Sequence, residues 1–413
     1  MTDIAIMEVL LHGESIGTLT NLPGDQILFA FNQEYIGNPD RPTLSLSFKD
    51  SIGGLITAVK PTRTRLAPFF SNLLPEGAMR DYLAGRARVD SEREFFLLWA
   101  LGGDLPGALK VHSTDENTWP PEAPSDVSDE EREIGEDAIL RFSLAGVQLK
   151  FSAIKENTGG LTIPVNGMGG SWIVKLPSTK FNGVPENEFA MMELARRVGM
   201  DVPETTLMPL NQIAGLPKEV DSLGGDGLAI KRFDRADEGT PVHIEDFAQI
   251  FGVYPEKKYA RASYRNIAEV IWAETGEPGI AEFIRRIVFN ALIGNGDMHL
   301  KNWSLIYPDR RKPALAPAYD FVSTIPYMKE EKLALTFVDS KEFESLDLDQ
   351  FDRFAGKAGL PRNLVLKTAQ ETVELFAEKW NSADDLPIKE EIQIAINTHL
   401  ERIPLWKNKA HFD

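Results

Sequence analysis

The sequence predicts an α+β fold in which a strand-rich N-terminal part precedes a mainly helical C-terminal part. Short runs with alternating apolar residues at 5–11, 17–22 and 28–31 are typical of strands joined by turns. After about Val242 the apolar residues recur at helical spacing to the end of the chain, interrupted by one hairpin near 303–320. The order of the two patterns indicates a strand-rich lobe followed by a helical lobe.

Length and composition limit the classes of protein to consider. The chain has 413 residues, of which 43% are hydrophobic, so it can bury a large core and form two or three domains. It contains no cysteine, which excludes disulfides, thiolate metal sites and cysteine nucleophiles. No stretch approaches the roughly 18 apolar residues that span a bilayer, and Asp3 and Glu8 stand where a signal peptide carries positive charge. We therefore expect a cytoplasmic protein.

The net charge argues against nucleic acid as the main substrate. Acidic residues number 62 and basic residues 44, which gives a formal charge of −18. A protein this acidic repels phosphate backbones unless a local basic patch outweighs the total. Any contact with DNA is therefore expected to depend on a basic partner.

The first hundred residues predict a small mixed subdomain that ends at a linker. The clearest helix in it is expected at Glu92–Leu101, where Ser91 and Glu94 stand at capping-box spacing. The segment Ser113–Asp137 is rich in proline, serine and acidic residues, as solvated connectors are. We therefore divide the chain into an N-terminal subdomain (1–112), an acidic linker (113–137), a second strand-rich lobe (138–241) and a helical lobe (242–413).

The second strand-rich lobe is predicted to contain three strands and a helix. The strands are expected at 148–154, 172–176 and 228–233. The helix is expected at Asn187–Gly199, where apolar residues recur at helical spacing and the final glycine can end the helix.

Polar residues that suit catalysis follow an apolar helix in the C-terminal part. Residues 280–292 have one apolar helical face. The Gly294–Gly296 run then ends the helix, so the polar residues after it are expected on a loop. A hairpin at 303–307 and 314–318 then returns Asp320 to this loop. The loop residues are Asp297, His299, Lys301 and Asn302.

This set of side chains matches what phosphoryl transfer needs. That reaction uses a carboxylate to orient or deprotonate the attacking hydroxyl and oxygen ligands for Mg²⁺ on the phosphates. Asp297 suits the base, and Asn302 with Asp320 suits the metal, since Mg²⁺ favours one or two carboxylates with waters and substrate oxygens. The alternative is that Asp297 and Asn302 only cap turns after the helix, as polar loop residues commonly do.

Two further segments are candidates for binding phosphates. In the run 141–154, a glycine among small and polar residues opens into a strand, where backbone N–H groups can approach phosphates. It is neither a Walker A motif nor a full GxGxxG, so an ordinary strand-entry turn is the alternative. Lys175 alternates with Ile173 on an apolar strand and needs an anionic partner such as phosphate, with Glu188 a candidate counter-charge. The alternative is an edge-strand lysine whose ammonium reaches solvent.

In their order along the chain, these motifs resemble the HipA kinase family. The resemblance rests on SLAGVQLK (143–150), IVKLP (173–177), IKRFDR (230–235), GNGDMHLKN (294–302) and AYDFVS (318–323), and it spans nearly the whole chain. It implies a protein-kinase-like two-lobed fold with an extra N-terminal subdomain, and ATP and Mg²⁺ as cofactors.

The resemblance also implies roles for single residues. Asp297 is similar to the catalytic Asp, Asn302 and Asp320 to the Mg²⁺ ligands, and Lys175 to the phosphate-binding lysine. Ser143 matches a serine that such kinases phosphorylate on themselves. The remaining residues implied to bind ATP are Ala145, Gly146, Val147, Gln148, Leu149 and Lys150 in the phosphate loop, Lys231, Arg232 and Phe233 in the hinge, and His299, Leu300, Lys301, Asn302, Tyr319 and Asp320 in the pocket.

The biology that the resemblance implies is growth arrest by a serine/threonine protein kinase that is the toxin of a type II toxin–antitoxin pair. Its target would be an aminoacyl-tRNA synthetase such as glutamyl-tRNA synthetase. Its partner would be a HipB-like helix-turn-helix antitoxin, through which it joins operator DNA. We find no strong basic cluster in the C-terminal lobe, and the segment 340–354 is acidic, so direct DNA contact by this chain is not expected. Two other functions stay open: a catalytically silent corepressor scaffold and a small-molecule kinase of the same fold.

Overall fold

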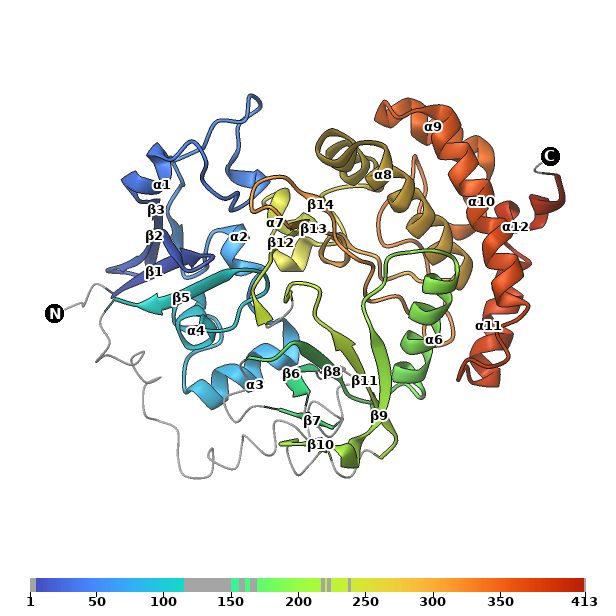
Figure 1. Ribbon diagram of the computed structural model, residues 1–413, viewed down its shortest axis with the longest axis horizontal. Coiled ribbons are helices and arrows are strands. Elements are labelled where there is room, and N and C mark those ends of the chain that lie inside the picture. The colour runs from blue at the N-terminus through green and yellow to red at the C-terminus, as the bar shows by residue number, and fades with distance from the viewer. Residues whose placement is uncertain are drawn as a thin grey trace.

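The computed structural model describes residues 5–114, 150–155, 160–163, 169–216, 220, 224–236 and 239–411. Figure 1 shows three parts in chain order: an N-terminal sheet with short helices, a second sheet beside α6, and a helical part that ends in α9–α12 at the far end of the molecule. Strands dominate the first two parts and helices the last, so the predicted α+β arrangement is confirmed. The domain boundaries stay a prediction, and residues 115–137 of the predicted linker lie outside the described residues.

The N-terminal part is an antiparallel sheet with the strand order β4-β3-β2-β1-β5. The strand β1 coincides with the run expected from alternation, and a turn at His12 and Gly13, both with positive φ, leads into β2. The elements of this part are β1 (Ala5–Leu11), β2 (Glu14–Leu22), β3 (Gln26–Phe31), α1 (Gln33–Gly37), η1 (Leu46–Phe48), β4 (Thr62–Arg63), α2 (Pro68–Ser71), α3 (Gly77–Ala87), α4 (Glu94–Leu101) and β5 (Leu109–Ser113).

The capping box expected at the start of α4 is wrong. The N-cap is Arg93, and no side chain caps the helix. The carboxylate of Glu94 is instead fully buried, where it accepts hydrogen bonds from the Leu66 N–H (2.8 Å) and the Ser71 hydroxyl (2.9 Å). A buried carboxylate needs such donors, and these come from a segment that local spacing does not reveal.

The second part is a six-stranded sheet with the order β10-β7-β6-β8-β11-β9, antiparallel except for the pair β10–β7. The three expected strands correspond to β6, β8 and β11, and the expected helix to α6. Met79 and Tyr82 of α3 belong to the hydrophobic core of this sheet, so the N-terminal part packs directly on it. The elements are β6 (Lys150–Lys155), β7 (Leu161–Thr162), β8 (Trp172–Lys175), α6 (Val184–Arg197), β9 (Thr205–Pro209), η3 (Leu210–Gln212), β10 (Ile213–Ala214) and β11 (Asp226–Lys231).

The third part is built around α8, which is kinked at Gly276 (φ +67°), just before Pro278. Beyond the kink, the apolar face predicted for 280–292 is buried, as expected. The expected hairpin is present as β13 and β14, and β12 joins it as a third strand that the sequence analysis missed. The elements are β12 (His243–Asp246), α7 (Phe247–Ile250), η6 (Pro255–Lys257), α8 (Tyr264–Ile293), η7 (Leu300–Asn302), β13 (Ser304–Tyr307), β14 (Ala314–Leu315), η8 (Phe343–Ser345), α9 (Leu348–Ala358), α10 (Arg362–Trp380), α11 (Glu390–Leu400), α12 (Pro404–Lys407) and η9 (Asn408–His411).

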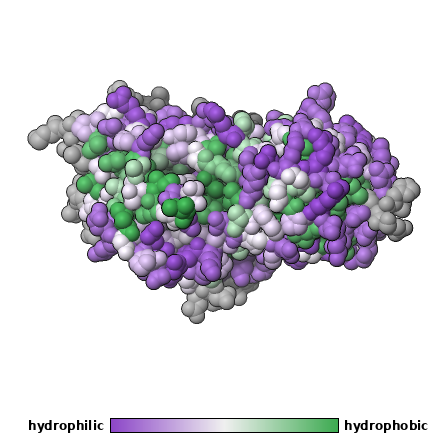
Figure 2. All heavy atoms as spheres, turned by 90° about the horizontal axis from the view of Figure 1, so that it is seen from above, coloured by the Kyte–Doolittle hydropathy of each residue, from purple (hydrophilic) through white to green (hydrophobic). Residues whose placement is uncertain are grey.

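The surface differs between the two ends of the molecule. In Figure 2, hydrophilic residues cover most of the end formed by the C-terminal helices, whereas hydrophobic residues are more frequent toward the N-terminal sheet. Within the described parts of the chain, no helix is both long and apolar enough to cross a membrane.

Candidate active site

Lys175, Glu188 and Asp320 form an ion-pair triad between the second and third parts, in which Lys175 and Glu188 are buried and Asp320 is partly exposed. The Lys175 ammonium lies 2.5 Å from Oε1 of Glu188 and also pairs with Oδ1 of Asp320. Each residue comes from a different element: Lys175 ends β8, Glu188 lies on α6, and Asp320 follows the β13–β14 hairpin with φ +57°. The triad therefore joins the sheet, its helix and the helical part at one point.

The Lys175 ammonium attracts both carboxylates of the triad. Burial disfavours the charged form of Lys175, but Asp320 and Glu188 outweigh it and raise the pKa of its ammonium. Burial raises the pKa of Glu188, although Lys175 opposes the shift. Burial likewise disfavours ionised Asp320, but Lys175 and Lys150 lower its pKa to about 2. Asp320 is therefore an anion and Lys175 a cation at neutral pH.

Asn295 connects the loop of Asp297 to the segment of Asp320. Its side chain is fully buried and donates hydrogen bonds to Oδ1 of Asn290 (2.8 Å) and to the carbonyl of Asp320 (3.4 Å). Its amide oxygen accepts the N–H of Asp297 at 3.0 Å. From the sequence, Asn295 was expected only as part of the Gly294–Gly296 helix stop. The structure makes it the link between two of the predicted site residues.

Asp297 lies at the mouth of the site with its carboxylate half exposed. Its Oδ1 accepts a hydrogen bond from the phenol of Tyr259, and its carbonyl accepts one from Nδ2 of Asn302 at 2.9 Å. Burial raises the pKa of Asp297, while the bond from Tyr259 and the charge of Lys258 oppose that shift. The carboxylate thus lies at the rim of the site, where one oxygen contacts an exposed tyrosine.

His299 is a neutral side chain beneath this rim. Burial, followed by the charge of Lys258, lowers its pKa to about 3. Its ring meets Tyr259 edge to face at 4.9 Å, and Nδ1 has no hydrogen-bond partner among the described residues. The 3.9 Å between Nε2 and Oδ1 of Asp297 is too long for a hydrogen bond. His299 therefore packs beneath Tyr259 and is not a proton donor to Asp297.

Backbone hydrogen bonds to neighbouring segments fix two of the three predicted hinge residues. The N–H groups of Lys231 and Arg232 donate to the carbonyls of Glu204 and Ser171, both at 2.8 Å. The ring of Phe233 lies 5.5 Å from that of Tyr319. No partner for the Phe233 N–H is found in the part of the chain that the structure describes.

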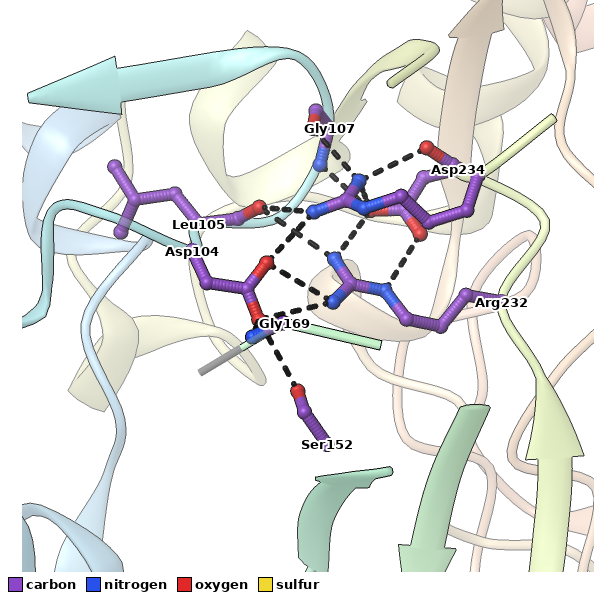
Figure 3. Close-up of polar contacts among 8 residues, drawn as sticks. Asp104, Leu105, Gly107, Ser152, Gly169, Arg232 and Asp234 are labelled. Atoms are coloured by element: carbon purple, nitrogen blue, oxygen red, sulfur yellow. Dashed lines mark hydrogen bonds and ion pairs between the residues drawn. The ribbon is translucent and has the colours of Figure 1, made fainter. Parts of the chain in front are cut away.

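The side chain of Arg232 points away from the hinge into a buried ionic network, shown in Figure 3. Its guanidinium lies 2.8 Å from Oδ2 of Asp234 and 3.2 Å from Oδ1 of Asp104, a residue of the N-terminal part. Arg235 contacts the same two carboxylates at 2.9 Å, and the N–H of Gly169 donates to Asp104 at 2.7 Å. The network joins the hinge to the N-terminal part.

Both the N-terminal and the C-terminal regions of the chain match models of known domain families. Residues 7–112 match the HipA N-terminal domain, and residues 142–380 match the HipA-like C-terminal domain. The chain belongs to the HipA family.

Relatives of this HipA-family chain support the same assignment. It is 54% identical to "Putative kinase Y4dM" of Sinorhizobium fredii over 99% of this chain and 100% of that protein. It is 27% identical to the serine/threonine-protein kinase toxin HipA of Shewanella oneidensis, over 74% of each chain. The structure also matches HipA from the Shewanella oneidensis complex of HipA, HipB and operator DNA. The TM-score is 0.73 at 22% identity, and the match covers 98% of this chain and 97% of that one. The kinase-like two-lobed fold is thus confirmed.

The HipA-type site contains donors that fit a metal ion bound together with phosphates. The described residues include no group of three or more His, Cys, Asp or Glu side chains that could hold a metal unaided. Asp320 is ionised, and Asn302 donates to the Asp297 carbonyl through Nδ2, so its amide oxygen is not used in this bond. One carboxylate and one amide fit Mg²⁺ held partly by substrate oxygens.

The other predicted site residues lie in different surroundings. Lys150 begins β6 and is the register partner of Lys175, whereas Ser143 and residues 145–149 lie outside the described residues. Leu300 is fully buried, and its N–H donates to the carbonyl of Lys258 at 3.3 Å. Lys301 forms an ion pair with Glu76 at 2.7 Å.

Three residues of the site were not predicted as site residues from the sequence: Glu76, Asn295 and Tyr259. A local signal existed for one of them, because Tyr259 lies in the basic run 257–265.

Proposed function

We propose that this chain is an ATP- and Mg²⁺-dependent serine/threonine protein kinase of the cytoplasm. The main support is the triad of Lys175, Glu188 and Asp320 beside the loop that carries Asp297 and Asn302. This arrangement provides a cation for the phosphates, oxygen ligands for a metal and a separate carboxylate at the rim. Phosphoryl transfer to a hydroxyl uses these three components.

In the proposed reaction, Lys175 binds phosphate oxygens of ATP and Phe233 contacts the adenine through its N–H. Asp320 and Asn302 would hold Mg²⁺, which neutralises charge that develops on the phosphates. Asp297 orients the hydroxyl of the substrate and accepts its proton. The hydroxyl oxygen forms a bond to the γ-phosphorus as the bond to the β-phosphate oxygen breaks, and ADP is released.

We propose that the remaining residues predicted to bind ATP do bind it. They include the loop Ala145–Leu149 and the pocket residues His299 and Lys301. We further propose that the enzyme phosphorylates itself on Ser143. A phosphoryl group adds about −1.5 to −2 charges, so modification next to the phosphate loop would repel ATP and turn the enzyme off. A comparison of the ATP affinity of the phosphorylated form with that of the unmodified form tests this proposed inhibition. Equal affinities would contradict it.

We propose that the chain is the toxin of a toxin–antitoxin pair with a HipB-like antitoxin, which would provide most of the contact with operator DNA. The support is the likeness to HipA in a complex with HipB and operator DNA. The proposed target is an aminoacyl-tRNA synthetase such as glutamyl-tRNA synthetase. The support for this target is membership of the HipA family.

One experiment tests the enzymatic part and separates it from the alternatives. A cell lysate is incubated with γ-labelled ATP and either wild-type protein or the variant Asp297→Asn. We expect labelled protein bands with wild type and a loss of about 10²–10⁴ in rate with the variant, as removal of a general base causes. No label above background would favour a silent corepressor scaffold. Label found only in small molecules would favour a small-molecule kinase.

A further inference from the structure

Asn187 on α6 binds the backbone of Ser323, which lies three residues after Asp320. Its Nδ2 donates to the Ser323 carbonyl at 2.9 Å, and its Oδ1 accepts the Ser323 N–H at 3.1 Å. Nδ2 also donates to the phenol oxygen of Tyr327 at 3.2 Å. Asn187 and Ser323 are both fully buried, so these groups need partners within the protein. One side chain therefore satisfies both backbone groups of a buried residue.

The segment that Asn187 binds contains a residue with an unfavourable backbone conformation. Asp320 has a φ of +57°, in the left-handed region that favours glycine. Such a conformation persists where the surrounding contacts fix it. Before Asp320, the N–H of Ala318 donates to the carbonyl of Asp201 at 2.7 Å. After it, Asn187 holds Ser323. The bonds of Asn187 thus help to keep Asp320 in this conformation.

Asn187 also directly precedes Glu188, the residue of α6 that belongs to the triad. Glu188 is connected to Asp320 indirectly, through the ammonium of Lys175. Asn187 is connected to the same segment directly, through the backbone of Ser323. Successive residues of a helix point about 100° apart, so α6 holds the segment 320–323 from two directions. The place of Asp320 therefore depends on α6 both through its charge and through its backbone.

We infer that Asn187 is a positioning residue, which fixes the segment 320–323 so that the carboxylate of Asp320 can hold the metal bound with ATP. The inference rests on the proposed kinase function and adds to it a buried residue that acts through another side chain. Loss of Asn187 would leave Lys175 and Glu188 in place and release the metal ligand. An Asn187 that only stabilised the fold would instead affect every property of the site together.

The test compares the variant Asn187→Leu with two others. Leucine keeps the branched shape of the side chain but removes both bonds to Ser323. The control Ser323→Ala keeps both bonds, because Asn187 binds the backbone, and removes a hydroxyl that has no partner among the described residues. Asp320→Ala removes the proposed metal ligand itself. The readouts are ATP affinity with and without Mg²⁺, measured by calorimetry, and hydrogen exchange at the amide of Ser323 relative to the amides of α10.

We expect Asn187→Leu to weaken ATP binding in the presence of Mg²⁺ about 10-fold or more, as the loss of two hydrogen bonds predicts. Binding without Mg²⁺ should stay nearly unchanged. The amide of Ser323 should exchange about 10-fold faster or more, because its acceptor is lost. Ser323→Ala should match wild type in both measurements. Equal losses of affinity with and without Mg²⁺, or unchanged exchange at Ser323, would overturn the inference.

A double variant decides whether Asn187 acts through Asp320. If it does, Asn187→Leu added to Asp320→Ala causes no further loss of affinity for ATP with Mg²⁺. Losses that add would overturn the inference and show that Asn187 acts on the fold as a whole. If Asn187→Leu does not fold, Asn187→Ala replaces it in every comparison, since alanine removes the same bonds without adding volume.

The two readouts also separate failure of the inference from failure of the proposed function. If wild type does not bind ATP with Mg²⁺, the proposed kinase function fails. Hydrogen exchange without any ligand then still decides whether Asn187 holds the segment. Faster exchange at Ser323 in Asn187→Leu would support the positioning role, and unchanged exchange would overturn it.

Discussion

Glu76 of the N-terminal part forms an ion pair with Lys301 of the loop that carries Asp297, with 2.7 Å between Oε1 and Nζ. Its second oxygen lies 3.0 Å from the ammonium of Lys258. Burial opposes the ionised form of Glu76, but Lys301 and Lys258 lower its pKa to about 2. The N-terminal part therefore contacts the candidate active site through a charged side chain, in addition to packing against the sheet.

This contact predicts that Glu76→Gln lowers the rate of phosphotransfer more than a control variant of similar thermal stability does. The Gln amide can still accept a hydrogen bond but carries no charge, so Lys301 is oriented less firmly. We expect kcat/KM to fall about 3- to 10-fold, within the roughly 0.5–1.5 kcal/mol of one ordinary hydrogen bond. The matched control is Glu256→Gln, which removes another carboxylate between the same two parts, one that pairs with Arg65. Both variants are compared in kinase rate and in thermal unfolding. Equal effects on rate would mean that Glu76 only joins the two parts.

A second prediction concerns the phenol of Tyr259, which occupies Oδ1 of Asp297. A substrate hydroxyl must displace this phenol, so Tyr259→Phe should raise kcat/KM for protein substrates by about 10-fold or more, since a hydrogen bond to a charged group is worth roughly 1.5–3 kcal/mol. The same bond lowers the pKa of Asp297. Its loss should therefore move the acidic limb of the pH–rate profile to higher pH. A drop in rate with an unchanged profile would show that Tyr259 positions the carboxylate and does not compete for it.

A third prediction concerns the metal. Asp320→Ala should weaken ATP binding far more with Mg²⁺ than without it, because the carboxylate is proposed as a ligand that the metal shares with the phosphates. Asn302→Ala should do the same more mildly, since it removes a neutral ligand. Calorimetric titration of ATP with and without Mg²⁺ measures both. An equal loss under the two conditions would indicate general disruption of the Lys175 ion pair instead.

The parts of the site that follow local rules could be predicted from the sequence. Gly294 ends α8 with φ +66°, so the polar residues after it had to lie on a loop. The turn 308–313 between the short segments 303–307 and 314–318 indicated a hairpin, and the hairpin brings Asp320 back to that loop. A lysine within the apolar strand β8 required an anionic partner, and Glu188 provides one.

Other parts of the site depend on contacts between distant segments, which local patterns do not encode. Tyr259 reaches Asp297 from 38 positions earlier in the chain, and β12 becomes a strand by pairing with β13. Glu94 shows the same limit. Its spacing from Ser91 suits a capping box, but its burial beneath α2 decides its role. The domain boundaries and the roles of the site residues stay predictions.

A fourth prediction concerns the network behind the hinge. Asp104→Ala leaves the guanidinium groups of Arg232 and Arg235 short of a partner in a buried setting, where their side chains are 6% and 10% exposed. Removing one partner of a buried pair costs about 3–5 kcal/mol. The matched control is Asp25→Asn, which weakens the partly exposed pair with Arg93 without putting alanine at the positive φ of this position (+56°), and it should cost about 1 kcal/mol or less. Urea denaturation measures both. Similar losses would mean that water replaces Asp104 in the network.

The last prediction is a pH dependence of stability that originates at Glu245. This fully buried carboxyl accepts hydrogen bonds from the Ser45 hydroxyl (2.5 Å), the Leu46 N–H (3.0 Å) and the phenol of Tyr307. Burial outweighs these donors and raises its pKa from 4.5 to about 7. The folded protein therefore holds the proton more tightly than the unfolded chain does. The stability that this provides is fully present below pH 4.5 and is lost as the pH rises through 7. The shift corresponds to roughly 3 kcal/mol.

Glu245→Gln keeps the shape of the protonated side chain but cannot ionise. Relative to wild type, the variant should therefore gain free energy of unfolding as the pH rises from about 4.5 to 7, and the gain should level off above pH 7. Urea unfolding at several pH values measures this difference. Contributions of other groups cancel in it, including that of His243, whose pKa burial lowers to about 4 and which changes stability in the opposite direction. A difference that stays constant with pH would mean that Glu245 is ionised throughout, because its three donors outweigh the effect of burial.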